Sequence, residues 1–95
     1  MNSKQKQHLK ALAHDLDPTA HVGKNGLTPE ALAHIDKALV DHELIKVRFQ
    51  AMKEEKEAIS AEIVRKTGAE LVEILGNVAV IYRQSPDPEK RTVKP

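Results

Sequence analysis

The chain has 95 residues, enough for one domain with a core but too few to enclose a deep, buried active site. It contains no cysteine, which excludes disulfides and thiolate metal sites, and its formal net charge of +1 argues against a general polyanion binder. No signal sequence is recognisable and no apolar run approaches the roughly 20 residues of a membrane span, so we expect a cytoplasmic protein with no membrane partner.

The first segment, from about residue 3 to residue 16, has the pattern of an amphipathic helix with Ser3 as a candidate N-cap. Four apolar residues recur at the spacing of one helical face, namely Leu9, Leu12, Ala13 and Leu16. Asp17-Pro18 ends the helix, because the residue before a proline is pushed out of the helical region. Residues 19–22 then predict a short strand.

A GxxG loop, Gly23-Lys24-Asn25-Gly26, follows this strand. Its glycines allow positive φ and let the main chain come close to a ligand, as the GXXG loop of KH domains does with sugar-phosphate. We expect free amide donors from residue 24 to residue 27, because Thr28 would cap the next helix with its own side chain and Pro29 has no amide. The same residues also suit a purely structural turn, so both interpretations stay open.

Thr28-Pro29-Glu30 is a strong helix start, and the apolar stripe that follows predicts a helix to about His42. Residues 43–50 then alternate as a strand. One face of this strand carries Ile45, Val47 and Phe49, and the other carries Leu44, Lys46 and Arg48.

The last third of the chain predicts a helix and a hairpin. Residues 53–66 are rich in helix formers and end before Gly68, and residues 70–75 and 77–82 are joined through Gly76-Asn77. The order αβαβαββ predicts an α/β fold of the α+β two-layer type with a mixed four-stranded sheet. Residues 1–84 form the expected domain, and residues 85–95 predict a disordered tail with little to bury.

Basic residues gather in the first half of the chain. The candidates for anion contact are Lys4, Lys6, Lys10 and His14 on the first helix, Lys24 in the loop, and Lys46 and Arg48 on the second strand. No acidic residue precedes Asp15, and the glutamates from Glu54 to Glu62 lie far along the chain. We expect the first helix to pack near the loop, where the two would form one positive face.

Motifs for catalysis are missing. No two of the five histidines lie at i, i+4, and no serine has the context of a nucleophile elbow. We therefore expect no metal, no cofactor, no small-molecule substrate and no enzymatic activity. Phe49 and Tyr82 are the only aromatic residues, which disfavours a sheet that stacks successive bases.

Three stretches of the sequence resemble the CRM domain in its single-domain bacterial form, the YhbY-like proteins. They are SKQKQHLKALAHDL, HVGKNGLTPEALAHIDKAL and HELIKVRF, followed by the hairpin that ends in VIYR. The resemblance implies an RNA-binding fold similar to the C-terminal domain of translation initiation factor 3. It also implies contact with ribosomal RNA in precursors of the large subunit, as a ribosome-assembly factor.

The resemblance assigns RNA contact to the loop residues Gly23, Lys24, Asn25 and Gly26, to Lys4, Lys10 and His14 on the first helix, and to Lys46 and Arg48. Asp17 departs from the pattern, since many members have a basic residue before this proline. The leading hypothesis is a protein that binds structured RNA through the loop and a basic face. The alternative is a protein-protein interaction module in which the loop is only a turn.

Overall fold

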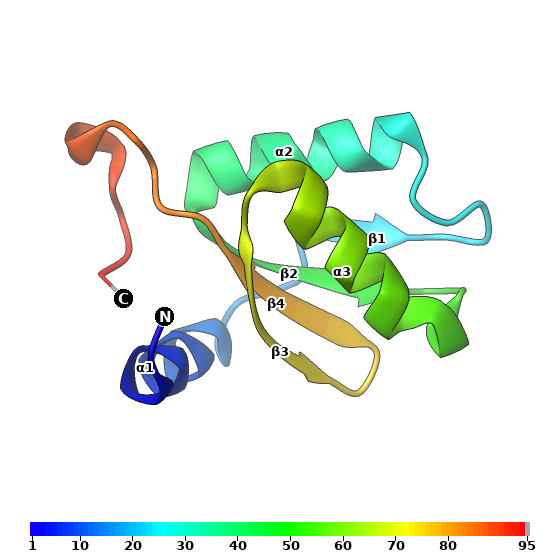
Figure 1. Ribbon diagram of the computed structural model, residues 1–95, viewed down its shortest axis with the longest axis horizontal. Helices are drawn as coiled ribbons and strands as arrows, with labels where there is room; N and C mark the ends of the chain where they lie inside the picture. The colour runs from blue at the N-terminus through cyan, green and yellow to red at the C-terminus, as the bar shows by residue number, and fades with distance from the viewer. Residues whose placement is uncertain (95) are drawn as a thin grey trace.

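The computed structural model describes residues 1–94 (Figure 1). The helices are α1 (Ser3–Ala13), α2 (Pro29–His42) and α3 (Lys56–Thr67), with short 3-10 helices η1 (Lys53–Glu55) and η2 (Pro88–Lys90). The strands are β1 (Ala20–Val22), β2 (Leu44–Phe49), β3 (Glu70–Leu75) and β4 (Val78–Tyr82). None of the helices in this part of the chain is long and apolar enough to cross a membrane.

The four strands form one mixed sheet in the order β1-β2-β4-β3. β1 pairs with β2 in parallel, whereas β4 is antiparallel to both β2 and β3. Gly76 has φ 60° in the turn between β3 and β4, where the sequence predicts a tight hairpin. A β-bulge shifts the register of β3 between Leu71 and Glu73. The predicted α+β fold with a mixed four-stranded sheet is confirmed.

One face of the sheet is covered by α2 and α3. The alternation of β2 sends Ile45, Val47 and Phe49 to this face, where each is at most 1% exposed. Other buried members of the same cluster come from β1, α2, α3 and β4, among them Val22, Ile35, Leu39, Ile63 and Ile81. This larger core fixes the position of β1 and so of the loop that follows it.

Helix α1 covers part of the opposite face. Its Leu9 and Ala13 pack in a second cluster whose sheet residues are Leu44, Val72, Val80 and Tyr82. Leu44 stands at the start of β2, whereas Lys46 and Arg48 occupy the same face further along the strand. The helix therefore lies over one end of the sheet, away from the loop after β1 (Figure 1). The expectation that α1 packs near the loop is wrong.

Local signals set the helix ends. The N-cap of α1 is Asn2 rather than Ser3, because Asn2 and Gln5 form a capping box with bonds of 2.8 and 3.0 Å. Thr28 Oγ1 accepts the amide of Ala31 at 3.1 Å, which confirms the predicted start of α2. Gly68 ends α3 with φ 73°, also as predicted.

We refer to residues 85–94 as the C-terminal segment. The sequence predicts a disordered tail here, whereas the structure places the segment against the domain. The difference comes from Glu43, whose buried carboxylate accepts hydrogen bonds from the backbone amides of Ser85, Thr92 and Val93. Sequence reasoning treated Glu43 as the start of an alternating strand and assigned it no partner.

Candidate nucleic-acid interface

The GxxG loop projects from one end of the molecule, between β1 and α2 (Figure 1). The amide of Gly26 donates to the carbonyl of Gly23 at 3.0 Å, which closes a tight turn. Lys24 and Asn25 are exposed at its tip. Within residues 1–94, the amides of Lys24, Asn25 and Leu27 have no acceptor, so three of the four expected donors point to no group of the described chain.

The two glycines of the loop differ in what the fold requires of them. Gly26 is buried and has φ 72°, a conformation that side chains with a Cβ rarely adopt. Gly23 does not have a positive φ, and a Cβ placed on it would meet no atom within 4 Å. The turn therefore explains the glycine at position 26, but nothing in the described chain requires one at position 23.

The base of the loop is held by the main chain. The amides of Gln50 and Ala51, just after β2, both donate to the carbonyl of Val22, at 3.0 and 3.3 Å. Leu27 packs against the larger core cluster from the other side of the loop. The exposed tip is thus presented on a fixed base, which limits the conformational entropy that a ligand would have to remove.

A second group of cations lies on the sheet face that α1 leaves uncovered. Lys46 donates through Nζ to the carbonyls of His14 and Leu16, at 3.3 and 2.9 Å, and so satisfies free carbonyls after the end of α1. Arg48 is exposed on the same face beside His21, its partner in the register of β1 and β2. The sequence predicted His21 as part of a positive face but not as a contact residue, and its register with Arg48 puts both side chains on this face.

Lys10 of α1 and His14, which directly follows α1, join Lys46 around a groove of about 140 Å³. Glu73 lines the same groove, and its carboxylate lies 3.9 Å from Lys10 Nζ. We call this set of residues the sheet groove. Its positive charge is partly compensated, because one carboxylate faces three basic side chains.

The predicted site residues therefore fall into three places. Lys24 lies in the loop, Lys10, His14 and Lys46 line the sheet groove with Arg48 further along β2, and Lys4 and Lys6 lie on the first turns of α1. Loop and α1 are at opposite ends of a molecule whose longest extent is 35 Å (Figure 1). The structure does not join them into one compact positive face.

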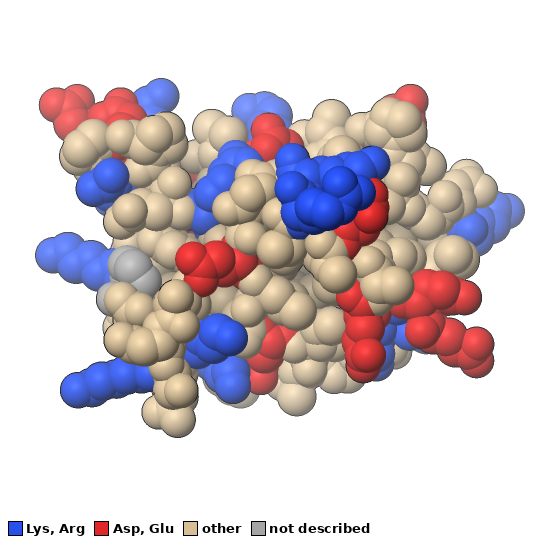
Figure 2. Space-filling model, viewed as in Figure 1, with Lys and Arg blue, Asp and Glu red and all other residues tan. Residues whose placement is uncertain are grey.

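Acidic side chains lie closer to the loop than the sequence suggests. Figure 2 shows them concentrated at the end that carries η1 and the start of α3, while basic side chains project at the opposite end. Met52, which directly precedes η1, has its Cε 3.8 Å from the position of a Cβ on Gly26. Glu54 and Glu55 thus follow a residue that touches the loop, and they weaken the positive potential there.

Within residues 1–94, no three histidine, aspartate or glutamate side chains come together as metal ligands would. The aromatic side chains are also inaccessible, with Phe49 1% and Tyr82 5% exposed. The polar groups at the loop and the sheet groove are thus backbone amides and basic side chains, together with Asn25 and Glu73. Such groups suit a phosphate backbone better than a stack of bases.

Comparison with known proteins places this arrangement in a family. The CRS1/YhbY (CRM) domain matches residues 1–83. The chain belongs to the CRM domain family. An RNA-binding protein of Haemophilus influenzae is 49% identical to it over 86 residues, which are 90% of this chain and 87% of the relative. A probable RNA-binding protein of Pseudomonas aeruginosa is 37% identical over 91 residues, covering 95% and 88% of the two chains.

The fold of this CRM domain is also found in a solved structure. The solution structure of a candidate RNA-binding protein from Staphylococcus aureus superposes with a TM-score of 0.81. It is 34% identical, and the superposition covers 99% of each chain. The resemblance noted from the sequence motifs is thereby confirmed for both family and fold.

Proposed function

We propose that this CRM domain binds structured RNA and that the GxxG loop contacts the sugar-phosphate backbone. The observation that carries the proposal is Gly23, which the fold does not require, next to amides of Lys24 and Asn25 that have no acceptor within residues 1–94. A glycine in open space leaves room for the backbone of a ligand to approach those amides. The names of the relatives, which describe RNA-binding proteins, support RNA as that ligand.

In this mechanism the loop amides donate to phosphate oxygens and Lys24 supplies the charge. Lys46 and Arg48, with Lys10 and His14 in the sheet groove, contact further phosphates along the uncovered face. Because Phe49 and Tyr82 are buried, recognition depends on the shape and charge of the RNA rather than on stacking. The protein then acts by binding, without a chemical step of its own.

We further propose that the RNA is ribosomal RNA in precursors of the large subunit, and that the protein is an assembly factor. The resemblance of the sequence to bacterial YhbY-like proteins supports this assignment. Crosslinking in cells, followed by sequencing of the bound RNA, tests it. We expect fragments of precursor ribosomal RNA, and recovery of dispersed messenger RNA would contradict the assignment.

The role of the loop is tested with a pair of variants. Lys24→Glu should weaken binding to a structured RNA by about 1–3 kcal/mol, because it removes a charge-assisted contact and adds repulsion. Gly23→Ala should also weaken binding, because its methyl group occupies the space a phosphate would approach. Both variants should keep the thermal stability of the wild type, since neither changes a contact within the fold.

Lys37→Glu is the matched control, because Lys37 is an exposed lysine on α2 with its side chain 76% accessible. It makes the same change in net charge away from the loop, so its effect on RNA binding measures long-range repulsion. Thermal unfolding of this variant accounts for the loss of the ion pair between Lys37 and Asp41. If Lys24→Glu binds RNA no worse than Lys37→Glu, and Gly23→Ala no worse than the wild type, the loop is a structural turn. The protein-interaction module then becomes the better interpretation.

A further inference from the structure

Glu43 combines three features that are rare in one residue. It follows the last turn of α2 with φ 63°, a conformation that is strained for any residue other than glycine. Its side chain is fully buried, although carboxylates are almost never buried unless paired. No salt bridge joins it to a basic residue within residues 1–94. Backbone strain of this kind persists only where the surroundings demand it.

The carboxylate of Glu43 is paired with the C-terminal segment instead. Oε2 accepts the amide of Ser85 at 2.5 Å, and Oε1 accepts the amides of Thr92 and Val93 at 2.6 and 3.0 Å. The hydroxyl of Thr92 lies 3.3 Å from the same Oε1. Burial raises the pKa of Glu43, but these hydrogen bonds outweigh it and hold the pKa below its ordinary value. The carboxylate of Glu43 is therefore an anion that binds the amides at both ends of the C-terminal segment.

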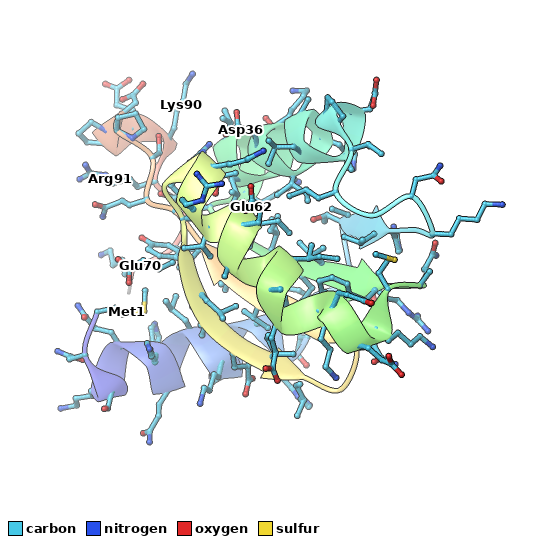
Figure 3. The ribbon with its side chains drawn as sticks, turned by 45° about the vertical axis from the view of Figure 1, so that its right-hand side comes forward. Met1, Asp36, Glu62, Glu70, Lys90 and Arg91 are labelled. Carbon is cyan, nitrogen blue, oxygen red and sulfur yellow. The ribbon has the colours of Figure 1, made fainter. Side chains whose placement is uncertain are left out.

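The segment also has internal support. Arg91 Nε donates to the carbonyl of Ser85 at 2.9 Å, and Asp87 caps η2 by accepting the amide of Glu89 at 3.0 Å. Val93 packs against the smaller core cluster under α1. Figure 3 shows Lys90 and Arg91 on the segment, on the side of the molecule that also carries Met1 and Glu70. The segment is thus fixed at its start, its turn and its end.

The course of the C-terminal segment places Lys94 beside the first turns of α1. Lys94, Lys4 and His8 line an open hollow of about 410 Å³ together with Asn2 and Gln5. The capping box engages the amides of Asn2 and Gln5, so the cationic groups available in the hollow are side chains. Among residues 1–94, no carboxylate lines it. We call Lys4, His8 and Lys94 the terminal patch.

We propose that the terminal patch is a second contact for RNA phosphate, and that Glu43 creates it by fixing the C-terminal segment against α1. The proposal rests on the RNA-binding function proposed above. It adds a contact at the end of the molecule opposite to the GxxG loop, where side chains provide the cations. An RNA that uses both contacts has to reach along the 35 Å length of the protein.

The test compares two lysines of the same segment. Lys94→Glu changes the terminal patch, whereas Lys90→Glu makes the same charge change on η2, where Lys90 lies near Leu39 and Val40 of α2. Affinity is measured for a long RNA hairpin, with Lys24→Glu as the reference for the loop. We expect Lys94→Glu to lower affinity by about five- to tenfold and Lys90→Glu by less than about twofold, since only the former removes a phosphate contact.

The role of Glu43 is tested in the same assay. Glu43→Gln removes the anion, so hydrogen exchange at the amides of Thr92 and Val93 should accelerate and the difference between Lys94→Glu and Lys90→Glu should disappear. Glu89→Gln is the control, because it makes the same chemical change on an exposed residue of the segment. If Glu43→Gln does not fold, Glu43→Gly serves instead, since glycine accepts the backbone conformation at φ 63°.

The outcomes separate the two proposals. If Lys24→Glu weakens binding but Lys94→Glu and Lys90→Glu have equal effects, the loop function stands and the terminal patch is overturned. The same conclusion follows if Glu43→Gln leaves the amides of Thr92 and Val93 protected. If the wild-type protein binds no structured RNA, the proposed function fails and the terminal patch fails with it.

Discussion

The two ends of this molecule present basic side chains in different ways. At the loop end, main-chain hydrogen bonds to Val22 and the turn at Gly26 fix the backbone, and Lys24 projects from it. At the opposite end, one buried side chain, that of Glu43, holds the segment that carries Lys94. The loop end depends on backbone geometry, whereas the other end depends on side chains, chief among them the carboxylate of Glu43.

This difference determines how mutations should act at each end. A backbone turn is insensitive to the side chains at its tip, so its ligand contacts can change without loss of stability. A buried carboxylate that pairs with three amides leaves those donors unsatisfied when it is replaced. Its replacement therefore lowers the stability of the fold and also releases the C-terminal segment from its position. Stability and binding should therefore separate at the loop end and change together at the other.

The largest effect is expected for Glu43→Gln. The variant should lose about 2–3 kcal/mol of unfolding free energy, because buried amides lose a charged acceptor. Urea denaturation at neutral pH measures this loss. Lys24→Glu, in the exposed loop, should stay within about 0.5 kcal/mol of the wild type. A Glu43→Gln protein as stable as the wild type would show that the C-terminal segment is not held in solution.

A smaller effect is expected from the two loop glycines. Gly26→Ala should destabilise the fold by about 1 kcal/mol, because alanine is strained at φ 72°. Gly23→Ala should change stability by less than about 0.5 kcal/mol, since its Cβ meets open space. Thermal unfolding of the two variants gives the comparison. Equal destabilisation would mean that both glycines serve the turn and would weaken the argument for close approach of RNA at Gly23.

The smallest effect is expected when the pH is lowered moderately from neutral. The folded pKa of Glu43 lies below its ordinary value of 4.5, so its stabilising contribution is complete above that value. It is lost only as the pH falls through the lower, folded pKa. Hydrogen exchange at Thr92 and Val93, corrected for the intrinsic rate, should therefore stay unchanged from pH 7 to pH 5 and accelerate in stronger acid. If these amides already lost their protection at pH 6, a group other than Glu43 would control the position of the C-terminal segment.

Much of the fold could be predicted because local signals agree with the tertiary structure. Thr28-Pro29, Gly68 and Gly76 define ends and turns by their own backbone chemistry, and each occupies the predicted place. The alternation of β2 likewise predicted which side chains enter the larger core. The position of α1 could not be predicted, because it depends on which end of the sheet offers Leu44, Val80 and Tyr82 as partners.

The arrangement of charges was predicted less well, for the same physical reason. Distance along the chain separated Glu54 from Lys24, but the fold brings η1 beside the loop through Met52. Lys46 was predicted as a free cation, whereas its Nζ donates to carbonyls at the end of α1. Glu43 gave no sequence signal, because a glutamate before an alternating strand usually faces water. Its acceptor role depends on a segment 42 residues later.

The bulge in β3 has a consequence for how copies of the protein behave at high concentration. β3 is an edge strand, and such strands offer free main-chain groups on which another chain could add a strand. The shifted register between Leu71 and Glu73 breaks the regular spacing of those groups. The feature that distorts the hairpin thereby discourages sheet extension and protects the folded protein from aggregation through this edge.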